Sequence, residues 1–215
     1  MKRTHIVILG APGSGKGTQA SRIAREWKLA HLSTGDMLRD AVARKAPLGL
    51  EAQGYMKGGL LVPDAIIFGL IGEALEGSNH AGWIMDGFPR TLAQAEELSA
   101  MLEKRREAID HVLNIDVDPE LIVRRLSNRR VCPKCKAVYN LDTIKTKVPG
   151  ICDACGATIV KRPDDEEATV RTRLEVYRRD TAPVIEYYRK RGGLVTVNGA
   201  GDIEEIFAEI RRVLK

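Results

Sequence analysis

A glycine-rich turn with one lysine is the part of this sequence best suited to chemistry. The segment GAPGSGKGTQ, residues 10–19, follows the apolar run IVIL and nearly matches the phosphate-binding pattern G-x-x-x-x-G-K-[ST]. Glycines bring backbone N–H groups close to oxyanions, the following helix points its positive dipole end there, and Lys16 adds a full charge. The lysine and the flanking strand and helix favour a nucleotide phosphate site over a turn without a ligand.

The match to this pattern fails at one position. Gly17 follows Lys16, and the hydroxyl comes one residue late, at Thr18. In the usual pattern the residue after the lysine touches Mg²⁺. Because Mg²⁺ readily retains several waters, we expect the ion to be held here more through water.

A second polar turn follows an apolar run at WIMDGFPRT, residues 83–91. Ligands of open α/β sheets bind at the carboxyl ends of the strands, so Asp86 is expected near Lys16, where it can act on the Mg²⁺ shell. The turn after Asp86 would project Arg90 over the site. A solvated Arg90 is the weaker alternative.

A third turn, Thr34-Gly35-Asp36, ends the short apolar run at residues 30–34 and is followed by Arg39. Arg39 either reaches the same ligand edge or is a solvated helix arginine, and the spacing alone favours neither.

Four cysteines form two C-x-x-C pairs separated by sixteen residues: Cys132, Cys135, Cys152 and Cys155. This spacing predicts a tetrahedral zinc site. Four thiolates close the coordination sphere, so the metal would be structural, and a short insertion with little core of its own needs such a metal. Iron or cobalt would also suit four thiolates, and unligated core cysteines are the remaining alternative.

Asp164 and Asp165 precede a helical stretch and allow two interpretations. One of them could cap the helix after Pro163, or the pair could orient Arg129 or Arg162 when the insertion closes.

The elements that must position these residues are short apolar runs alternating with amphipathic stretches. Strands are expected at residues 4–10, 30–34, 82–86, 111–117 and 193–199. Helices are expected at residues 14–27, 36–44 and 90–106, and after Asp202, where Glu205 completes a capping box. Such alternation predicts an α/β fold of the P-loop NTPase type: a five-stranded parallel sheet with helices on both faces.

Two segments interrupt the alternation and are expected to be insertions. Residues 33–62, the helical insertion, contain helical patches but no strand. Residues 128–165, the cysteine insertion, are rich in Cys, Pro and Gly and carry the predicted zinc site. The core would then comprise residues 1–32, 63–127 and 166–215.

Composition sets wider limits on function. The chain has 34 Lys and Arg against 29 Asp and Glu, a mild excess of +5 that suits polyphosphates as well as nucleic acid. No apolar segment approaches the roughly 18 residues of a membrane span, and the N-terminus lacks a signal-peptide pattern. We expect a cytoplasmic protein without a membrane partner, in which disulfides are rare.

Taken together, GAPGSGKGTQ, LSTGDMLR, DGFPRT, RRVC and RPDDEEATVRTRL resemble the adenylate kinase family in order and spacing, from Ile6 to at least Gly201. In that family glycine after the P-loop lysine is the rule, and many bacterial members carry a long, cysteine-liganded lid. The resemblance implies Mg²⁺-dependent phosphoryl transfer, ATP + AMP ⇌ 2 ADP, by a protein that is usually a monomer.

The resemblance also implies that residues 33–62 bind the nucleoside monophosphate and that residues 128–165 form a zinc-binding lid. It further implies the following binding residues. ATP would contact Gly13, Ser14, Gly15, Lys16, Gly17, Thr18, Arg129, Val138, Tyr139 and the backbone at Gly201. AMP would contact Thr34, Arg39, Leu60, Leu61, Val62, Gly87, Phe88, Pro89, Arg90 and Gln94. Arg162 and Arg173 would hold AMP or the transferring group. Leu60 and Gly201 stand where many or some relatives have lysine, so their contacts would be made by backbone.

Transfer between two polyanions needs positioning and neutralisation of charge, for which Lys16, Arg90, Arg129, Arg162 and Arg173 are the candidates. The acceptor is already anionic, so no general base is needed. A kinase for UMP or CMP is a near alternative, disfavoured by the long cysteine insertion and Thr91. A zinc-ribbon protein that binds nucleic acid is a remote one, because few aromatic residues interleave with basic ones.

Overall fold

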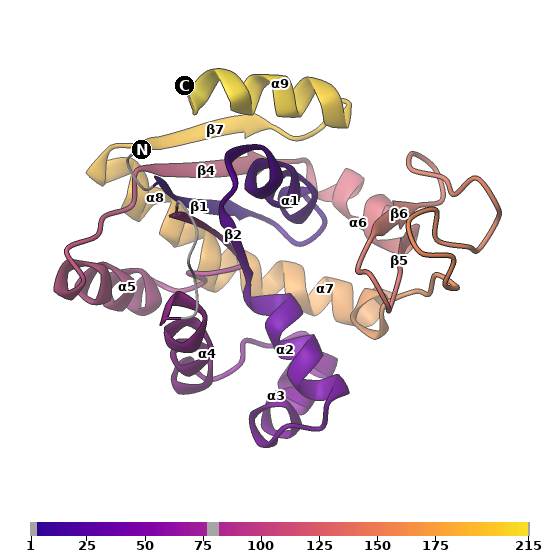
Figure 1. Ribbon diagram of the computed structural model, residues 1–215, viewed down its shortest axis with the longest axis horizontal. Helices are drawn as coiled ribbons and strands as arrows, with labels where there is room; N and C mark the ends of the chain where they lie inside the picture. The colour runs from indigo at the N-terminus through magenta and orange to yellow at the C-terminus, as the bar shows by residue number, and fades with distance from the viewer. Residues whose placement is uncertain (1–3, 77–81, 215) are drawn as a thin grey trace.

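The computed structural model describes residues 4–76 and 82–214, so the parts of the expected core at 1–3, 77–81 and 215 lie outside the described residues. Five strands form one parallel sheet in the order β2-β3-β1-β4-β7. Their bounds are β1 Thr4–Gly10, β2 Ala30–Ser33, β3 Gly82–Asp86, β4 His111–Asp116 and β7 Leu194–Asn198. This sheet confirms the fold class predicted from the sequence. Figure 1 shows it in the upper half of the molecule.

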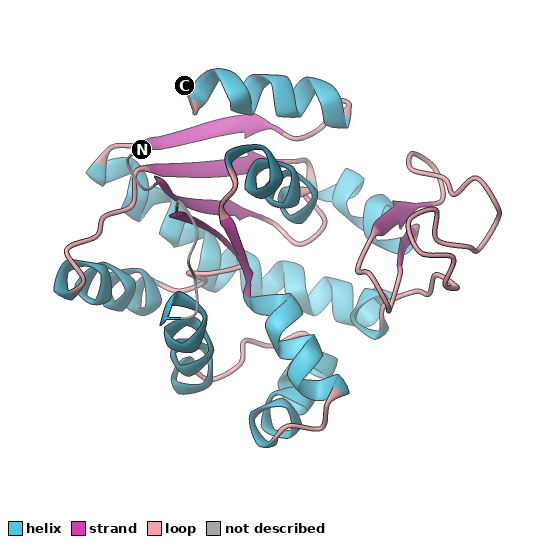
Figure 2. Cartoon of the chain, viewed as in Figure 1, coloured by secondary structure: helices cyan, strands magenta, loops and turns pink. Residues whose placement is uncertain are grey.

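The remaining elements surround this sheet (Figure 1). The α-helices are α1 Lys16–Trp27, α2 Thr34–Ala43, α3 Pro47–Gly58, α4 Asp64–Glu76, α5 Leu92–Lys104, α6 Pro119–Ser127, α7 Glu167–Val176, α8 Ala182–Arg191 and α9 Ile203–Val213. A 3-10 turn, η1 Pro163–Asp165, precedes α7, and a π turn, η2 Tyr177–Thr181, joins α7 to α8. In the cysteine insertion, β5 Arg129–Val131 and β6 Val138–Asn140 pair antiparallel, and most of the rest is loop (Figure 2).

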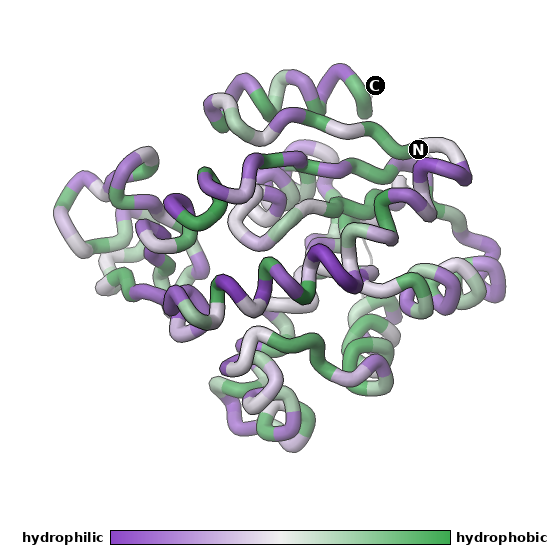
Figure 3. The backbone as a smooth tube through the Cα atoms, turned by 180° about the vertical axis from the view of Figure 1, so that it is seen from behind, coloured by the Kyte–Doolittle hydropathy of each residue, from purple (hydrophilic) through white to green (hydrophobic). Residues whose placement is uncertain are grey.

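Alternation along the strands sorts the core into two layers. Ile6 and Ile8 face a cluster that includes buried residues of α1 and α9. Val7 and Leu9 face the opposite cluster, which includes residues of α4, α5 and α8. Successive strand residues point to opposite faces, so a doubly covered sheet needs apolar residues at every position. Figure 3, seen from behind, shows hydrophobic and hydrophilic residues alternating along the long helix that runs across this side.

Local capping fixes where several helices begin. Asp202 and Glu205 form the predicted capping box of α9, which is confirmed. Thr91 accepts a hydrogen bond from the backbone of Gln94 at the start of α5. Helix α1 begins at Lys16, two residues later than predicted, because the chain before it is still a turn with Gly15 in a left-handed conformation. In the described part of the chain, no helix is long and apolar enough to cross a membrane.

Candidate functional site

Strand register brings the three polar turns to one edge of the sheet. Asp86, the last residue of β3, pairs with Ile8 on one side and with Ser33, the last residue of β2, on the other. The phosphate loop leaves β1 only two residues beyond Ile8. Because parallel strands end at a common edge, the phosphate loop and the turns after Ser33 and Asp86 surround one space.

The phosphate loop is shaped by the helices beneath it. Gly13 has a φ of 85°, and a Cβ there would lie 2.8 Å from Cγ of Leu126 on α6. Only glycine combines this conformation with such a close approach. Leu126 belongs to a buried cluster with residues of α7, so α6 and α7 together support the loop.

The polar groups of the loop are partly free for a ligand. Ser14 Oγ is buried and has no hydrogen-bond partner among the described residues, whereas its carbonyl accepts a hydrogen bond from Arg125 Nη1 at 3.3 Å. Lys16 Nζ donates to the carbonyl of Ala11 at 3.2 Å. Burial lowers the pKa of Lys16 to about 8. The Asp86 carboxylate raises this pKa, whereas the charges of Arg90, Arg173 and Arg129 lower it further. A bound phosphate would satisfy both the hydroxyl and the ammonium.

A close steric contact explains why glycine occupies position 17, where the usual motif has Ser or Thr. A Cβ at this position would lie 3.1 Å from Oδ2 of Asp86, tighter than most such contacts. Glycine therefore lets the carboxylate lie against the first turn of α1, next to Thr18. This buried carboxylate, beside the phosphate loop, is the kind of oxygen donor that Mg²⁺ accepts directly or through water.

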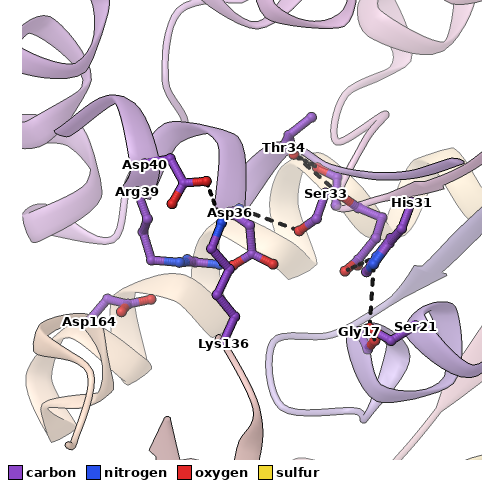
Figure 4. A network of polar contacts seen from close by, with 12 residues as sticks. Gly17, Ser21, His31, Ser33, Thr34, Asp36, Arg39, Asp40, Lys136 and Asp164 are labelled. Carbon is purple, nitrogen blue, oxygen red and sulfur yellow. Dashed lines mark hydrogen bonds and ion pairs between the residues drawn. The ribbon is translucent and has the colours of Figure 1, made fainter. Parts of the chain in front are cut away.

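His31 is a neighbour of Asp86 that the sequence analysis missed. Its Nε2 lies 3.5 Å from Asp86 Oδ2, and its Nδ1 lies 3.4 Å from Ser21 Oγ (Figure 4). Burial would raise the pKa of Asp86, but the His31 ring and the Lys16 ammonium hold it below its usual range. Asp86 is therefore anionic at neutral pH. The sequence offered one signal for this contact: His31 is a polar residue in β2, the strand next to β3, which ends in Asp86.

A pocket that is open to solvent lies between β3 and the helical insertion. Ten residues of the predicted AMP set line it: Thr34, Arg39, Leu60, Leu61, Val62, Gly87, Phe88, Arg90, Gln94 and Arg173. Pro89 lines a neighbouring pocket beside Lys16 instead, and Arg162 lines neither. Six lining residues were not predicted: Gly35, Leu38, Met56, Gly59, Ile67 and Asp164.

Arg90 is fixed by its backbone as well as by its side chain. Its N–H donates to Gln94 Oε1 at 2.7 Å, and its carbonyl accepts from Thr181 Oγ1 at 2.9 Å. Its Nε donates to the Gly87 carbonyl at 2.7 Å, which leaves the terminal nitrogens for a ligand. Burial, with the Arg173 charge, lowers the pKa of Arg90 to about 10. Thr181 comes from the π turn, so this irregular turn directly supports the site.

Two residues of α2 present polar groups to the pocket (Figure 4). Thr34 Oγ1 donates to the Gly87 carbonyl at 2.9 Å, which ties α2 to the turn after β3. Arg39 Nη2 donates to Asp36 Oδ1 at 2.6 Å. Burial would raise the pKa of Asp36, but the charge and hydrogen bond of Arg39 lower it below its usual value. Arg39 therefore lines the pocket while paired with Asp36, and its contact with a ligand stays a prediction.

The carboxylate of Asp165 holds two arginines. Arg129 donates to it from Nε at 2.7 Å and also from Nη2, and Arg173 Nη1 lies 3.3 Å away. Asp165 is completely buried, and Asp164 pairs with Arg173 at 3.0 Å. Glu166 occupies the N-cap position of α7, so the predicted capping role is wrong. Of the two aspartates, Asp165 contacts Arg129 and Asp164 contacts Arg173. That they orient Arg129 or Arg162 when the insertion closes stays a prediction.

Positive charge accumulates between the two insertions. Burial, Arg39 and Arg129 lower the pKa of Arg162 to about 10. Burial also lowers the pKa of Arg173, with a contribution from Arg129. Lys16, Arg39, Arg90, Arg129, Arg162 and Arg173 thus repel one another, and Asp36, Asp86, Asp164 and Asp165 compensate them only in part. Such a cluster is suited to a ligand with several negative charges.

The four cysteines converge in the cysteine insertion. Their sulfurs all lie within 4.8 Å of one another, with Cys132–Cys155 and Cys135–Cys152 pairs at 3.4 Å. A tetrahedron with metal–sulfur bonds of about 2.3 Å has sulfur–sulfur edges of about 3.8 Å, so the arrangement fits a zinc ion. The cysteines could therefore hold a structural metal remote from the pocket lining.

The remaining predicted ATP residues lie around the phosphate loop or in the cysteine insertion. Val138 and Tyr139 are on β6, opposite the strand that begins with Arg129. The Tyr139 hydroxyl lies 3.4 Å from Cys152 Sγ, so this side chain faces the cysteine cluster and leaves only its backbone for ATP. Gly201 is in the loop before α9. Gln19 on α1 donates from Nε2 to the carbonyl of Ile203, the first residue of α9, at 3.1 Å.

Comparison with known proteins agrees with this geometry. The family model described as adenylate kinase matches residues 8–193. The chain belongs to the adenylate kinase family. Similar proteins named adenylate kinase occur in Methanothrix thermoacetophila, 49% identical over 98% of this chain and 98% of the relative, and in Clostridium acetobutylicum, 47% identical over 97% and 98%. The Bacillus subtilis adenylate kinase is 44% identical over 98% of this chain and 97% of its own length. As in the rest of this family, a phosphotransferase site is expected at the shared edge.

Proposed function

We propose that this chain is an ATP:AMP phosphotransferase that interconverts ATP + AMP and two ADP. The observation that carries the proposal is the cluster of lysine and arginine side chains between the phosphate loop and the pocket of the helical insertion. A cationic passage between the phosphate loop and this pocket is suited to moving a phosphoryl group from one polyanion to another. Family membership supports the same activity.

In this proposal each part of the chain has a separate task. The phosphate loop, Gly13 to Thr18, with Val138, Tyr139 and Gly201, holds ATP. The pocket residues, with Pro89 and Arg162, hold AMP. Lys16, Arg90, Arg129, Arg162 and Arg173 neutralise the charge that spreads over the transferring group. When bound, Mg²⁺ would be held by Asp86 and Thr18, mainly through its waters, and would help to neutralise the charge of the phosphates.

The two insertions would act as covers that exclude water, the competing acceptor, until both nucleotides are bound. Core residues 1–32, 63–127 and 166–215 would form the rigid base, residues 33–62 the cover over AMP and residues 128–165 the cover over ATP. We infer that zinc is the metal held by the four cysteines. A cytoplasmic monomer without nucleic-acid or membrane partners is the simplest setting for such an enzyme.

The test is ADP formation from ATP with AMP, UMP, CMP or GMP as acceptor. AMP is expected to be used best, and a preference for UMP or CMP would replace the substrate assignment.

Lys16→Met should lower turnover by several orders of magnitude with an unchanged circular dichroism spectrum, because it removes the charge next to the transferring group. Lys104→Met, on the exposed end of α5, is the matched control. Near-wild-type turnover of Lys16→Met would refute the site assignment.

A further inference from the structure

One ion pair connects the two insertions directly. Residues 33–62 and 128–165 are all described, and the ion pair between them joins Lys136 Nζ to an Asp40 carboxylate oxygen. Both side chains are 45% exposed, so the pair lies at the outer mouth of the site rather than among the arginines inside. Figure 4 shows Lys136 reaching from the cysteine insertion to the face of α2 that carries Asp36 and Asp40.

Lys136 occupies a backbone position that favours glycine. It follows the second cysteine of the first C-x-x-C pair, and its φ is 63°, in the left-handed region. The equivalent residue of the second pair is Gly156, with a φ of 72°. In both pairs this residue donates its N–H to the carbonyl of the first cysteine at 2.9 Å. A lysine in the place where the sister turn has glycine is locally strained, which points to a role for its side chain.

The acidic partner lies on the helix that carries the AMP-side arginine. Asp40 is one helical turn after Asp36, so both carboxylates lie on the same face of α2. Asp36 binds Arg39 at 2.6 Å, and the Lys136 charge also acts on Asp36. The lysine therefore faces an acidic pair whose first member fixes Arg39.

We propose that Lys136 and Asp40 are positioning residues that hold the cysteine insertion against the helical insertion and so favour the arrangement that binds both nucleotides. The proposal rests on the function proposed above and assigns the pair no contact with substrate. Because the pair is exposed, its loss should raise the KM for AMP by only about two- to fivefold. The kcat should stay the same or rise slightly, since the arginines are untouched and product release requires the insertions to separate.

A double-mutant cycle tests the pair. Asp40→Asn, Lys136→Met and the double variant are compared at low salt and at about 0.5 M salt. Each single variant should raise the KM for AMP, the double variant should raise it no further, and high salt should remove the difference. Glu26→Gln is the matched control, since Glu26 pairs with Arg211 at 2.8 Å at a similarly exposed position away from the site. Multiplicative effects in the double variant, or an equal effect of Glu26→Gln, would overturn the proposal.

Lys136→Gly separates the side chain from the fold of the insertion. It relieves the left-handed strain, so the melting temperature should stay equal or rise while the KM for AMP rises as in Lys136→Met. An unchanged KM would refute the role of the side chain. Hydrogen exchange of residues 36–44 without nucleotide gives a readout that does not depend on the reaction. Asp40→Asn should speed hydrogen exchange in this segment, and Glu26→Gln should not. This result is expected even if the wild type forms no ADP. Equal exchange in the wild type and both variants would refute the role of the pair.

Discussion

The helical insertion supplies Arg39 to the cationic cluster, and the cysteine insertion supplies Arg129 and Arg162, but the two insertions are stabilised differently. In the helical insertion, Leu38, Ala52 and Val62 belong to one buried cluster with the strand residues Val7 and Met85. Its helices thus extend the main core. Its order does not depend on a ligand, because the apolar surface it buries is shared with the sheet.

The cysteine insertion has a separate small cluster. Its buried members are Cys132, Tyr139 and Cys152, with a few partly buried neighbours. So little apolar surface cannot offset the entropy of ordering the segment, and four thiolates around a metal can. Two insertions beside one site can therefore have independent stabilities. One should melt only with the whole protein, and the other should respond to its metal.

Metal removal should give the largest effect and separate the two insertions. Structural zinc contributes about 10–16 kcal/mol to small zinc domains, so the cysteine insertion should lose most of its local stability. Hydrogen exchange should rise across residues 132–160 and stay unchanged across residues 34–58, and the melting temperature should fall. Catalysis should persist until the insertion unfolds, and added zinc should restore the exchange pattern. Activity that tracked metal content while the insertion remained folded would contradict a structural role.

Leu38→Ala tests the opposite property of the helical insertion. Leu38 is 5% exposed, and its truncation should cost about 2–5 kcal/mol. Because its cluster is shared with the sheet, the whole protein should melt in one transition, lowered by about 6–12 °C for a loss of about 3 kcal/mol. Leu50→Ala, at a 56% exposed position of α3, should change stability by less than about 0.5 kcal/mol. A separate early transition of the helical insertion would show that it is not part of the core.

Local patterns predicted the features that depend on sequence neighbours alone. The strand-helix alternation gave the parallel sheet, and the spacing of Asp202 and Glu205 gave the capping box. The spacing of the cysteines predicted that they meet. Each of these depends on periodicity, capping or ligand spacing, which are properties of short segments.

Contacts between distant segments could not be predicted in the same way. The approach of His31 to Asp86 depends on the register of β2 against β3. The π turn before α8, which brings Thr181 to the Arg90 carbonyl, is a local irregularity that no period of hydrophobic residues encodes. The ambiguity at Asp165 was resolved only by the fold, since both helix capping and arginine binding suit a carboxylate before a helix.

Asp165→Asn tests how the cysteine insertion holds its arginine. The substitution keeps the shape but removes the charge that binds Arg129 and Arg173, so both guanidinium groups lose orientation. Misplacement of this kind should lower kcat by roughly ten- to a hundredfold, with a smaller change in the KM for AMP. Asp164→Asn is the matched control, because among the described residues Asp164 forms its ion pair with Arg173 and not with Arg129, and it is partly exposed. An equal loss in both variants would show that bidentate binding of Arg129 is not what matters.

The pH dependence of ATP binding sharpens the contrast between the core and the insertions. Lys16, in the core, has a pKa of about 8, whereas that of Arg162, in the cysteine insertion, is about 10. ATP favours charged Lys16 and should raise its pKa on binding, so the complex holds more protons than the free protein above about pH 8. Between about pH 7 and pH 8 the affinity should therefore change little, and above pH 8 it should fall by up to about tenfold per unit. Calorimetry in buffers of different ionisation enthalpy should detect uptake of nearly one proton per ATP at about pH 9 and almost none at about pH 7. Lys16→Arg should abolish this uptake, because arginine stays charged over the whole range. Equal affinity at both pH values would mean that the phosphate loop, like the insertions, presents a fixed charge.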